Sequence, residues 1–162
     1  MLTFSLRAAF VALLLTAPAY AQSGVGFDPS EETAIDAERV ERFEGGNRMV
    51  GSGGITITQP GVILKAERME ITFIPGTSEI DNLIAIGKVR YANVDGDAIA
   101  GARAVYRAND DQLTVTGDVV VLQGGQIATG NELVYNTDTG AMTMTSGPGG
   151  RVRSLIPKKA DS

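Results

Sequence analysis

An internal repeat is the feature of this sequence that most constrains its fold. A Gly-x-Val/Ile motif stands at Gly53-Gly54-Ile55, Gly87-Lys88-Val89 and Gly117-Asp118-Val119, so its copies lie 34 and 30 residues apart. A second motif, a small residue with apolar residues three and five positions later, begins at Ala66, Gly101 and Gly130, with a partial copy at Ala37. Periods of this length are typical of stacked architectures in which each unit covers its neighbour.

Within the repeat, apolar residues alternate with polar ones. The strings GGITITQ, DQLTVTG and GAMTMTSG place threonines between apolar residues, and this period of two predicts half-buried β-strands. Asp95-Gly96 and Gly124-Gly125 predict turns between them. Helical periodicity is weak and confined to SEETAIDAERVERF. We therefore predict an all-β chain whose end strands, near Ile35–Val40 and Val152–Ile156, have open edges.

The N-terminus predicts export. Arg7 precedes a short apolar run, and small residues at Ala19 and Ala21 form an A-x-A site, which is the layout of a secretory signal peptide. We expect a signal peptide over residues 1–21, a flexible lead-in over 22–34, the β domain over 35–157 and a polar tail over 158–162. The apolar run is shorter than the roughly 20 residues that span a bilayer, although an uncleaved anchor remains the alternative.

Composition excludes nucleic-acid binding and most kinds of catalytic and metal site. A net charge of −5 leaves no basic excess for nucleic acid. The chain has neither His nor Cys, which excludes a Ser-His-Asp triad, a thiolate nucleophile, a typical zinc site and disulfides. Asp95 and Asp97 have the spacing of calcium ligands, but the other ligands of such a loop are lacking, and an Asp-Gly turn explains them better. Without Trp and with 6% aromatic residues, a carboxylate-only glycosidase is also disfavoured. We expect no catalysis and no cofactor.

The repeat motifs together resemble those of the OstA-like family. LTVTGDVVVLQGGQIATGNELVYN resembles the tandem hallmark of that family, IDAERVE and ILKAERMEI are similar to its I.AD signature, and RVRSLIP is similar to its final strand. The family Asp is replaced by Glu67, Ala102 and Asn131. Because this residue is expected to form a turn or bulge, we expect its replacement to affect local geometry more than function.

The resemblance implies an OstA-like β jelly roll, which is a folded antiparallel sheet with an apolar groove and open ends. The layout is most similar to the soluble, LptA-like members of the family. For these the resemblance implies a periplasmic protein that holds the lipid A acyl chains of lipopolysaccharide and carries it from the inner to the outer membrane. It also implies head-to-tail homo-oligomers, an LptC-like inner-membrane partner and an LptD-like outer-membrane partner.

The alternation of the strands selects the residues of the inner face, which we predict to bind lipid. They are Ile55, Ile57, Leu64, Met69, Ile71, Phe73, Val89, Tyr91, Tyr106, Leu113, Val115, Val119, Val121, Leu133, Tyr135, Met142 and Met144. A dry core is the alternative for each of them. As a set they are aliphatic and include methionines, which suit an adaptable apolar surface. Each buried methylene of a ligand contributes about 0.8 kcal/mol.

Three further questions stay open at this level. A basic cluster near the C-terminus, Arg151, Arg153, Lys158 and Lys159, is either a solvated tail or a contact for lipid phosphates or an acidic partner. The chain could instead be an LptC-like, membrane-anchored member of the same pathway. It could also be a self-assembling β-stack that binds no lipid.

Overall fold

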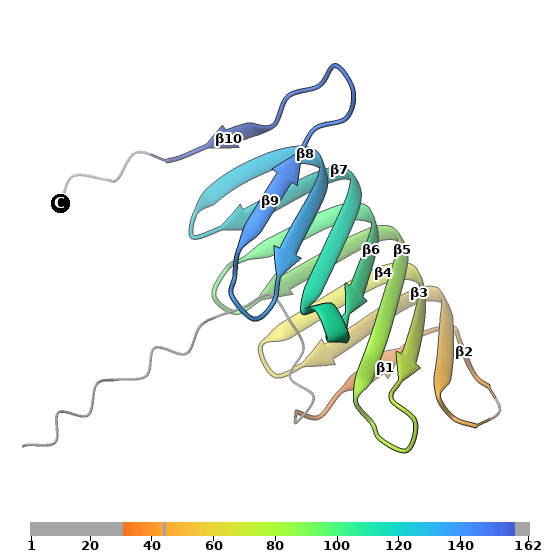
Figure 1. The fold of residues 1–162 in the computed structure, drawn as a ribbon. Helices are drawn as coiled ribbons and strands as arrows, with labels where there is room; N and C mark the ends of the chain where they lie inside the picture. Colours follow the sequence, from red (N-terminus) through yellow and green to blue (C-terminus); the bar gives the residue numbers. More distant parts are fainter. Residues whose placement is uncertain (1–30, 44, 158–162) are drawn as a thin grey trace, which may run out of the picture.

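The computed structural model of the chain describes residues 31–43 and 45–157, and these form one folded antiparallel sheet (Figure 1). The predicted signal peptide and polar tail lie outside the described residues. The strands are β1 (Ala34–Asp36), β2 (Arg39–Arg42), β3 (Arg48–Gln59), β4 (Val62–Phe73), β5 (Ile80–Asn93), β6 (Ala98–Arg107), β7 (Gln112–Gln123), β8 (Gln126–Asn136), β9 (Met142–Thr145) and β10 (Arg153–Leu155). A single 3-10 turn, η1 (Ala108–Asp110), precedes β7.

The order of the strands follows the sequence almost throughout. The sheet reads β1-β3-β4-β5-β6-β7-β8-β10, with β2 also paired to β3 and β9 also paired to β8. Each repeat of the sequence corresponds to a pair of long strands that curve over, one after another (Figure 1). The all-β fold and the open-ended, folded antiparallel sheet are thus confirmed.

The Gly-x-Val/Ile motifs are the places where the long strands bend. The register shifts by a β-bulge between Ser52 and Ile55 of β3, between Ile86 and Val89 of β5, and between Thr116 and Val119 of β7. The two residues inside each bulge have left-handed backbone, with φ of 80° at Gly87 and 48° at Lys88 in the β5 copy. Such bulges bend a strand and increase its twist. The repeat therefore encodes a bend at the same place in successive strands.

The second motif completes the bend on the neighbouring strands. Glu67 of β4 and Ala102 of β6 also fall within register shifts, as expected for the positions where the family Asp is replaced. Each lies over the bulge glycine of the following strand, and a Cβ added at Gly117 would lie 2.7 Å from the Cβ of Ala102. A glycine is needed here because both its φ of 82° and its close neighbour exclude a side chain. We call this line of bends the corner.

The corner divides the sheet into two arms. The first arm contains β1, residues 55–59, 62–66, 89–93, 98–100, 119–123 and 126–130, and β10. The second arm contains β2, residues 48–52, 68–73, 80–86, 103–107, 112–116 and 132–136, and β9. The turns that connect the strands lie at the two free rims. Each long strand therefore contributes half of its length to either arm.

A dry core fills the corner between the arms. The side chains of Ile55, Met69, Val115, Val119 and Leu133 are at most 2% exposed. Burial of side chains of this size contributes about 1.5–3 kcal/mol each, so this cluster accounts for much of the stability of a chain without disulfides. No helix in the described part of the chain is both long and apolar enough to cross a membrane.

Candidate functional site

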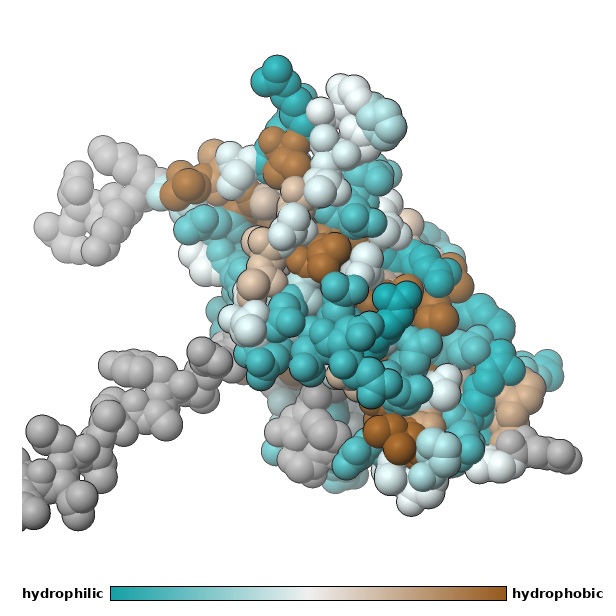
Figure 2. All heavy atoms as spheres, in the orientation of Figure 1, coloured by the Kyte–Doolittle hydropathy of each residue, from teal (hydrophilic) through white to brown (hydrophobic). Residues whose placement is uncertain are grey.

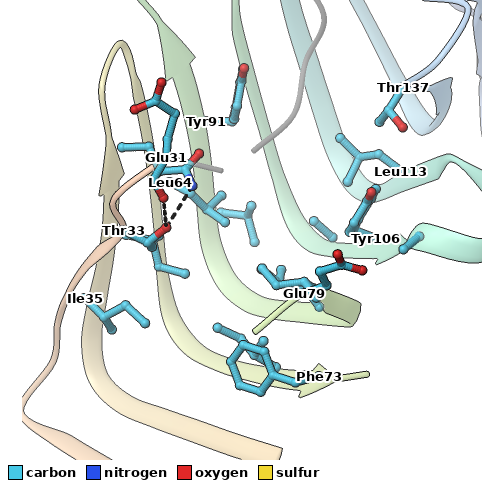
Figure 3. Close-up of a pocket in the computed structure, with 18 of the residues that line it drawn as sticks. Glu31, Thr33, Ile35, Leu64, Phe73, Glu79, Tyr91, Tyr106, Leu113 and Thr137 are labelled. Carbon is cyan, nitrogen blue, oxygen red and sulfur yellow. Dashed lines mark hydrogen bonds between the residues drawn. The ribbon is translucent and has the colours of Figure 1, made fainter. Parts of the chain in front are cut away.

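The space between the arms opens into an apolar groove on the side away from the corner (Figure 3). Its volume is about 490 Å³, within the range of small-molecule sites. The groove is lined by Glu31, Thr33, Ile35, Ile57, Gln59, Leu64, Ile71, Phe73, Ile74, Ser78, Glu79, Ile80, Leu83, Val89, Tyr91, Ile99, Ala104, Tyr106, Ala108, Leu113, Val115 and Thr137. Its lining comes from β1, β3 to β7 and the loops beside them.

The strand register shows which way the groove runs. On the first arm its wall is the row of successive Cα partners Ile35, Ile57, Leu64, Tyr91 and Ile99. On the second arm the wall is the row Ile71, Leu83, Tyr106 and Leu113. Each row takes one residue from each strand, and neighbouring strands lie about 4.8 Å apart. The groove therefore runs across the strands, along the axis on which the repeats stack.

The mouth of the groove is polar. Thr33, Gln59 and Glu31 lie on the rim of the first arm, and Ser78, Glu79 and Thr137 lie on the rim of the second. Gln59 Nε2 donates a hydrogen bond to Thr33 Oγ1 at 2.8 Å, and this bond holds the segment before β1 against β3 (Figure 3). A ligand that matches this arrangement has an apolar part inside and a polar part at the mouth.

Nine of the predicted lipid-binding residues line this groove. They are Ile57, Leu64, Ile71, Phe73, Val89, Tyr91, Tyr106, Leu113 and Val115. The other eight do not line it, and they are Ile55, Met69, Val119, Val121, Leu133, Tyr135, Met142 and Met144. The first six of these eight are buried, Met144 is packed against the core, and Met142 on the edge strand β9 is 41% exposed. Six of the nine groove residues are themselves at most 6% exposed, so the two groups differ in whether they line the groove and not in burial.

The groove ends before the C-terminal strands. In the wall rows, the partners that follow Ile99 and Leu113 are Val121 and Tyr135. Their exposures are 4% and 1%, and neither lines the groove. Tyr135 is among the largest fully buried side chains of the chain. The lining of the groove therefore extends over β3 to β7 and stops before β8.

Sequence reasoning missed several wall residues. Ile99 and Ile35 precede the small residues Gly101 and Ala37 by two positions, as Leu64 precedes Ala66, so the repeat contained the signal for both. Leu83 stands four residues before Gly87, as Leu113 stands four before Gly117, so the repeat marked it as well. Ile80 and Ile74 carry no such mark because they lie at the start of β5 and in the rim turn before it, outside both motifs. The polar residues at the mouth, among them Glu31 and Glu79, had no sequence signal that distinguished them from other loop residues.

The ion pairs that shift pKa values lie on the outer face, away from the groove. Arg48 Nε lies 2.7 Å from Glu70 Oε1 across β3 and β4. This hydrogen bond lowers the pKa of Glu70 and raises that of Arg48. Lys88 Nζ pairs with Glu67 Oε1 at 2.7 Å, which raises the pKa of the lysine. These ion pairs support strand pairing and place no activated group in the groove.

Acidic side chains at the rim have structural contacts. Asp97 is 8% exposed, and its Oδ1 accepts a hydrogen bond from the backbone N–H of Gly124 at 3.1 Å, which ties two rim turns together. Asp95-Gly96 forms the predicted turn, with φ of 88° at Gly96. Among the described residues no three metal-ligating side chains gather in one place.

Comparisons with known proteins agree with this geometry. A family model described as LptA/(LptD N-terminal domain) LPS transport protein matches residues 34–141. The crystal structure of LptH, the LptA homologous periplasmic component of the conserved lipopolysaccharide transport device from Pseudomonas aeruginosa, has the same fold, with a TM-score of 0.69 and 15% identity. That match covers 81% of this chain and 99% of LptH. A search of curated proteins finds no match.

Proposed function

The chain belongs to the LptA/LptD N-terminal domain family of LPS transport proteins, as its repeat motifs predicted, and from this premise we propose that it carries lipopolysaccharide by holding acyl chains in the groove between its arms. The family is one of transport proteins and not of enzymes. The observation that carries the proposal is the apolar groove of about 490 Å³ with its polar mouth.

The chemistry of the groove suits a long, slender apolar ligand. Its walls run across the strands, so a chain lying in it contacts a new pair of side chains at each step along the stack. Each buried methylene contributes about 0.8 kcal/mol. Because this contribution needs no directional bonds, an acyl chain can bind in the groove and still slide along it. The polar mouth leaves the sugars and phosphates of the ligand in water.

The open ends of the sheet support assembly into a bridge. One end presents β1 and β2, and the other presents β9 and β10. Leu155 and Ile156 at the β10 end are 65% and 70% exposed, and Figure 2 shows hydrophobic side chains on the surface at that end. An unpaired strand edge binds another strand through backbone hydrogen bonds. A head-to-tail chain of copies in the periplasm, between an LptC-like and an LptD-like partner, would extend the groove from one membrane to the other.

Lipid capture tests the groove directly. The exported chain is purified, its lipids are extracted, and lipopolysaccharide is measured by mass spectrometry. Leu113→Asp places a charge on a half-buried wall position and should abolish capture, because an unpaired charge is costly in an apolar site. Val94→Asp is the matched control on an 81% exposed rim turn and should capture lipid normally. Equal capture by both variants, with β circular dichroism retained, would contradict the proposal.

Removal of residues 151–162 tests the bridge. The truncated chain loses β10 but keeps the groove, so it should still capture lipid while failing to form chains. Sedimentation measures assembly, and far-UV circular dichroism reports the fold. Chains of normal length from a folded, truncated protein would show that β10 is not the joint, without affecting the lipid result.

A further inference from the structure

The outer side of the corner carries a cluster of basic side chains. Lys65 and Arg68 come from β4, Lys88 and Arg90 from β5, and Arg103 from β6. All five are exposed and flank the bulges of three successive strands. We call these five residues the corner ridge. Glu67 lies among them and pairs with Lys88, so the five bases and this acid together carry four positive charges, while Asp118 and Glu132 continue the corner as acids on β7 and β8.

The register places like charges side by side on the ridge. Lys65 and Arg90 are direct Cα partners on the outer face, an arrangement that destabilises a sheet. Their neighbours in the same row, Thr56 and Ala100, carry no compensating acid. Among the described residues neither Lys65 nor Arg103 forms an ion pair. A concentration of unpaired bases on adjacent strands is not explained by the folding of the chain.

The rims have the opposite charge. The described turns over residues 74–79, 94–97, 108–111, 124–125 and 137–141 contain six acids and no base. The acids are Glu79, Asp95, Asp97, Asp110, Asp111 and Asp138. Since the rims and the corner lie at opposite sides of the arms, the ridge on β4 to β6 is positive and these rim turns are negative. Such a charge separation orients the molecule with its corner facing an anionic surface.

An exposed apolar residue lies in the middle of the ridge. Ile86 is 41% exposed and is the Cα partner of Arg68 on one side and of Arg103 on the other. An apolar side chain between two arginines suits a surface with phosphates outside and hydrocarbon beneath. A purely ionic partner, such as an acidic protein face, would leave Ile86 without a favourable environment.

We propose that the corner ridge binds the phosphates of an anionic phospholipid surface, with the mouth of the groove turned away from that surface. This contact is separate from the lipid groove, which the ridge residues do not line. Each base near an anionic membrane contributes roughly a fivefold increase in affinity, so the ridge acts as a reversible contact. It would keep the transport chain oriented beside a membrane without anchoring it.

Vesicle sedimentation tests the proposal with the exported full chain. The chain should bind vesicles of mixed phosphatidylcholine and phosphatidylglycerol, and should leave vesicles of phosphatidylcholine alone. The double variants Lys65→Gln/Arg90→Gln and Arg68→Gln/Arg103→Gln should each bind the mixed vesicles on the order of 20-fold more weakly. The matched control Arg107→Gln/Arg153→Gln removes the same charge from exposed positions off the ridge and should bind as the unchanged chain does.

A fluorescent reporter locates the contact independently. The chain contains no Trp, so Ile86→Trp introduces a single indole whose emission should shift to the blue with the mixed vesicles. Val94→Trp, on an exposed rim turn, should show no shift. Equal weakening by the off-ridge control, equal binding to neutral vesicles, or a shift only at position 94 would each overturn the proposal. Displacement by millimolar inorganic phosphate would instead assign the ridge to free phosphate and overturn the lipid surface.

Discussion

The corner and the mouth of this molecule are built from the same alternating strands, yet one is a solid core and the other an open groove. On β7, Val119 in the corner is 1% exposed and Leu113 near the mouth is half-buried. Both point inward and both are aliphatic. The difference is their distance from the bend, because Val119 adjoins the bulge while Leu113 lies near the far end of the arm, where the groove opens. A side chain that points inward on a strand therefore does not, for that reason alone, line the binding groove.

The same contrast recurs along the stack. The second-arm row is open at Leu83, Tyr106 and Leu113 and filled at Tyr135. Tyr106, at the same position of the preceding repeat, lines the groove, so the row changes at the C-terminal end by its place in the stack and not by residue type. Three substitutions test this comparison of the core, the groove and the outer face, taken from the largest expected effect to the smallest.

A charge in the corner should have the largest effect. Leu133→Asp buries a carboxylate at a position that is 0% exposed and should destabilise the fold by more than about 4 kcal/mol. That is comparable with the total stability of a small domain, so we expect an unfolded or aggregated chain by circular dichroism and urea titration. Leu113→Asp should remain folded. If Leu133→Asp folds normally and loses only lipid, the corner is part of the groove.

Shortening the buried residue at the C-terminal end of the groove should have an intermediate effect. Tyr135→Ala should cost about 3–5 kcal/mol, as for other large-to-small changes in a core, while extending the groove toward β9. A photo-crosslinker at position 144 should then label lipid in the variant and not in the unchanged chain, with urea titration measuring the stability. Tyr135→Phe keeps the bulk and should stay closed. Labelling of the unchanged chain at position 144 would show that the C-terminal end already admits lipid.

Removing an outer-face ion pair should have the smallest effect and should leave lipid capture unchanged. Glu70→Gln breaks the bond to Arg48, whose side chain is 43% exposed, so the melting temperature should fall by a few degrees at most. The pKa of Glu70 is lower in the folded chain than its usual 4.5. The pair therefore stabilises fully above about pH 4.5 and loses this effect as the pH falls through the lower, folded pKa.

Thermal melts of the Glu70→Gln variant and the unchanged chain should consequently differ at neutral pH and converge in acid. A difference in melting temperature that grows as the pH falls would contradict this predicted pH dependence. Lipid capture measured beside the melts separates the outer face from the groove, since the two share no residue.

Local pattern determined the strands, the bends and the inner face of this protein, while the tertiary structure decided which inner residues line a groove. Alternation and left-handed glycines such as Gly117 act within a few residues, so local pattern predicted the strands and nine of the residues that line the groove, while the folded sheet was expected from the family resemblance. Where the groove ends depends on contacts between distant segments, because Val121 and Tyr135 follow Ile99 and Leu113 in the wall rows and yet do not line it. The basic corner ridge also arises only when β4, β5 and β6 lie side by side, because Lys65 and Arg90 are far apart in sequence and adjacent only through strand pairing.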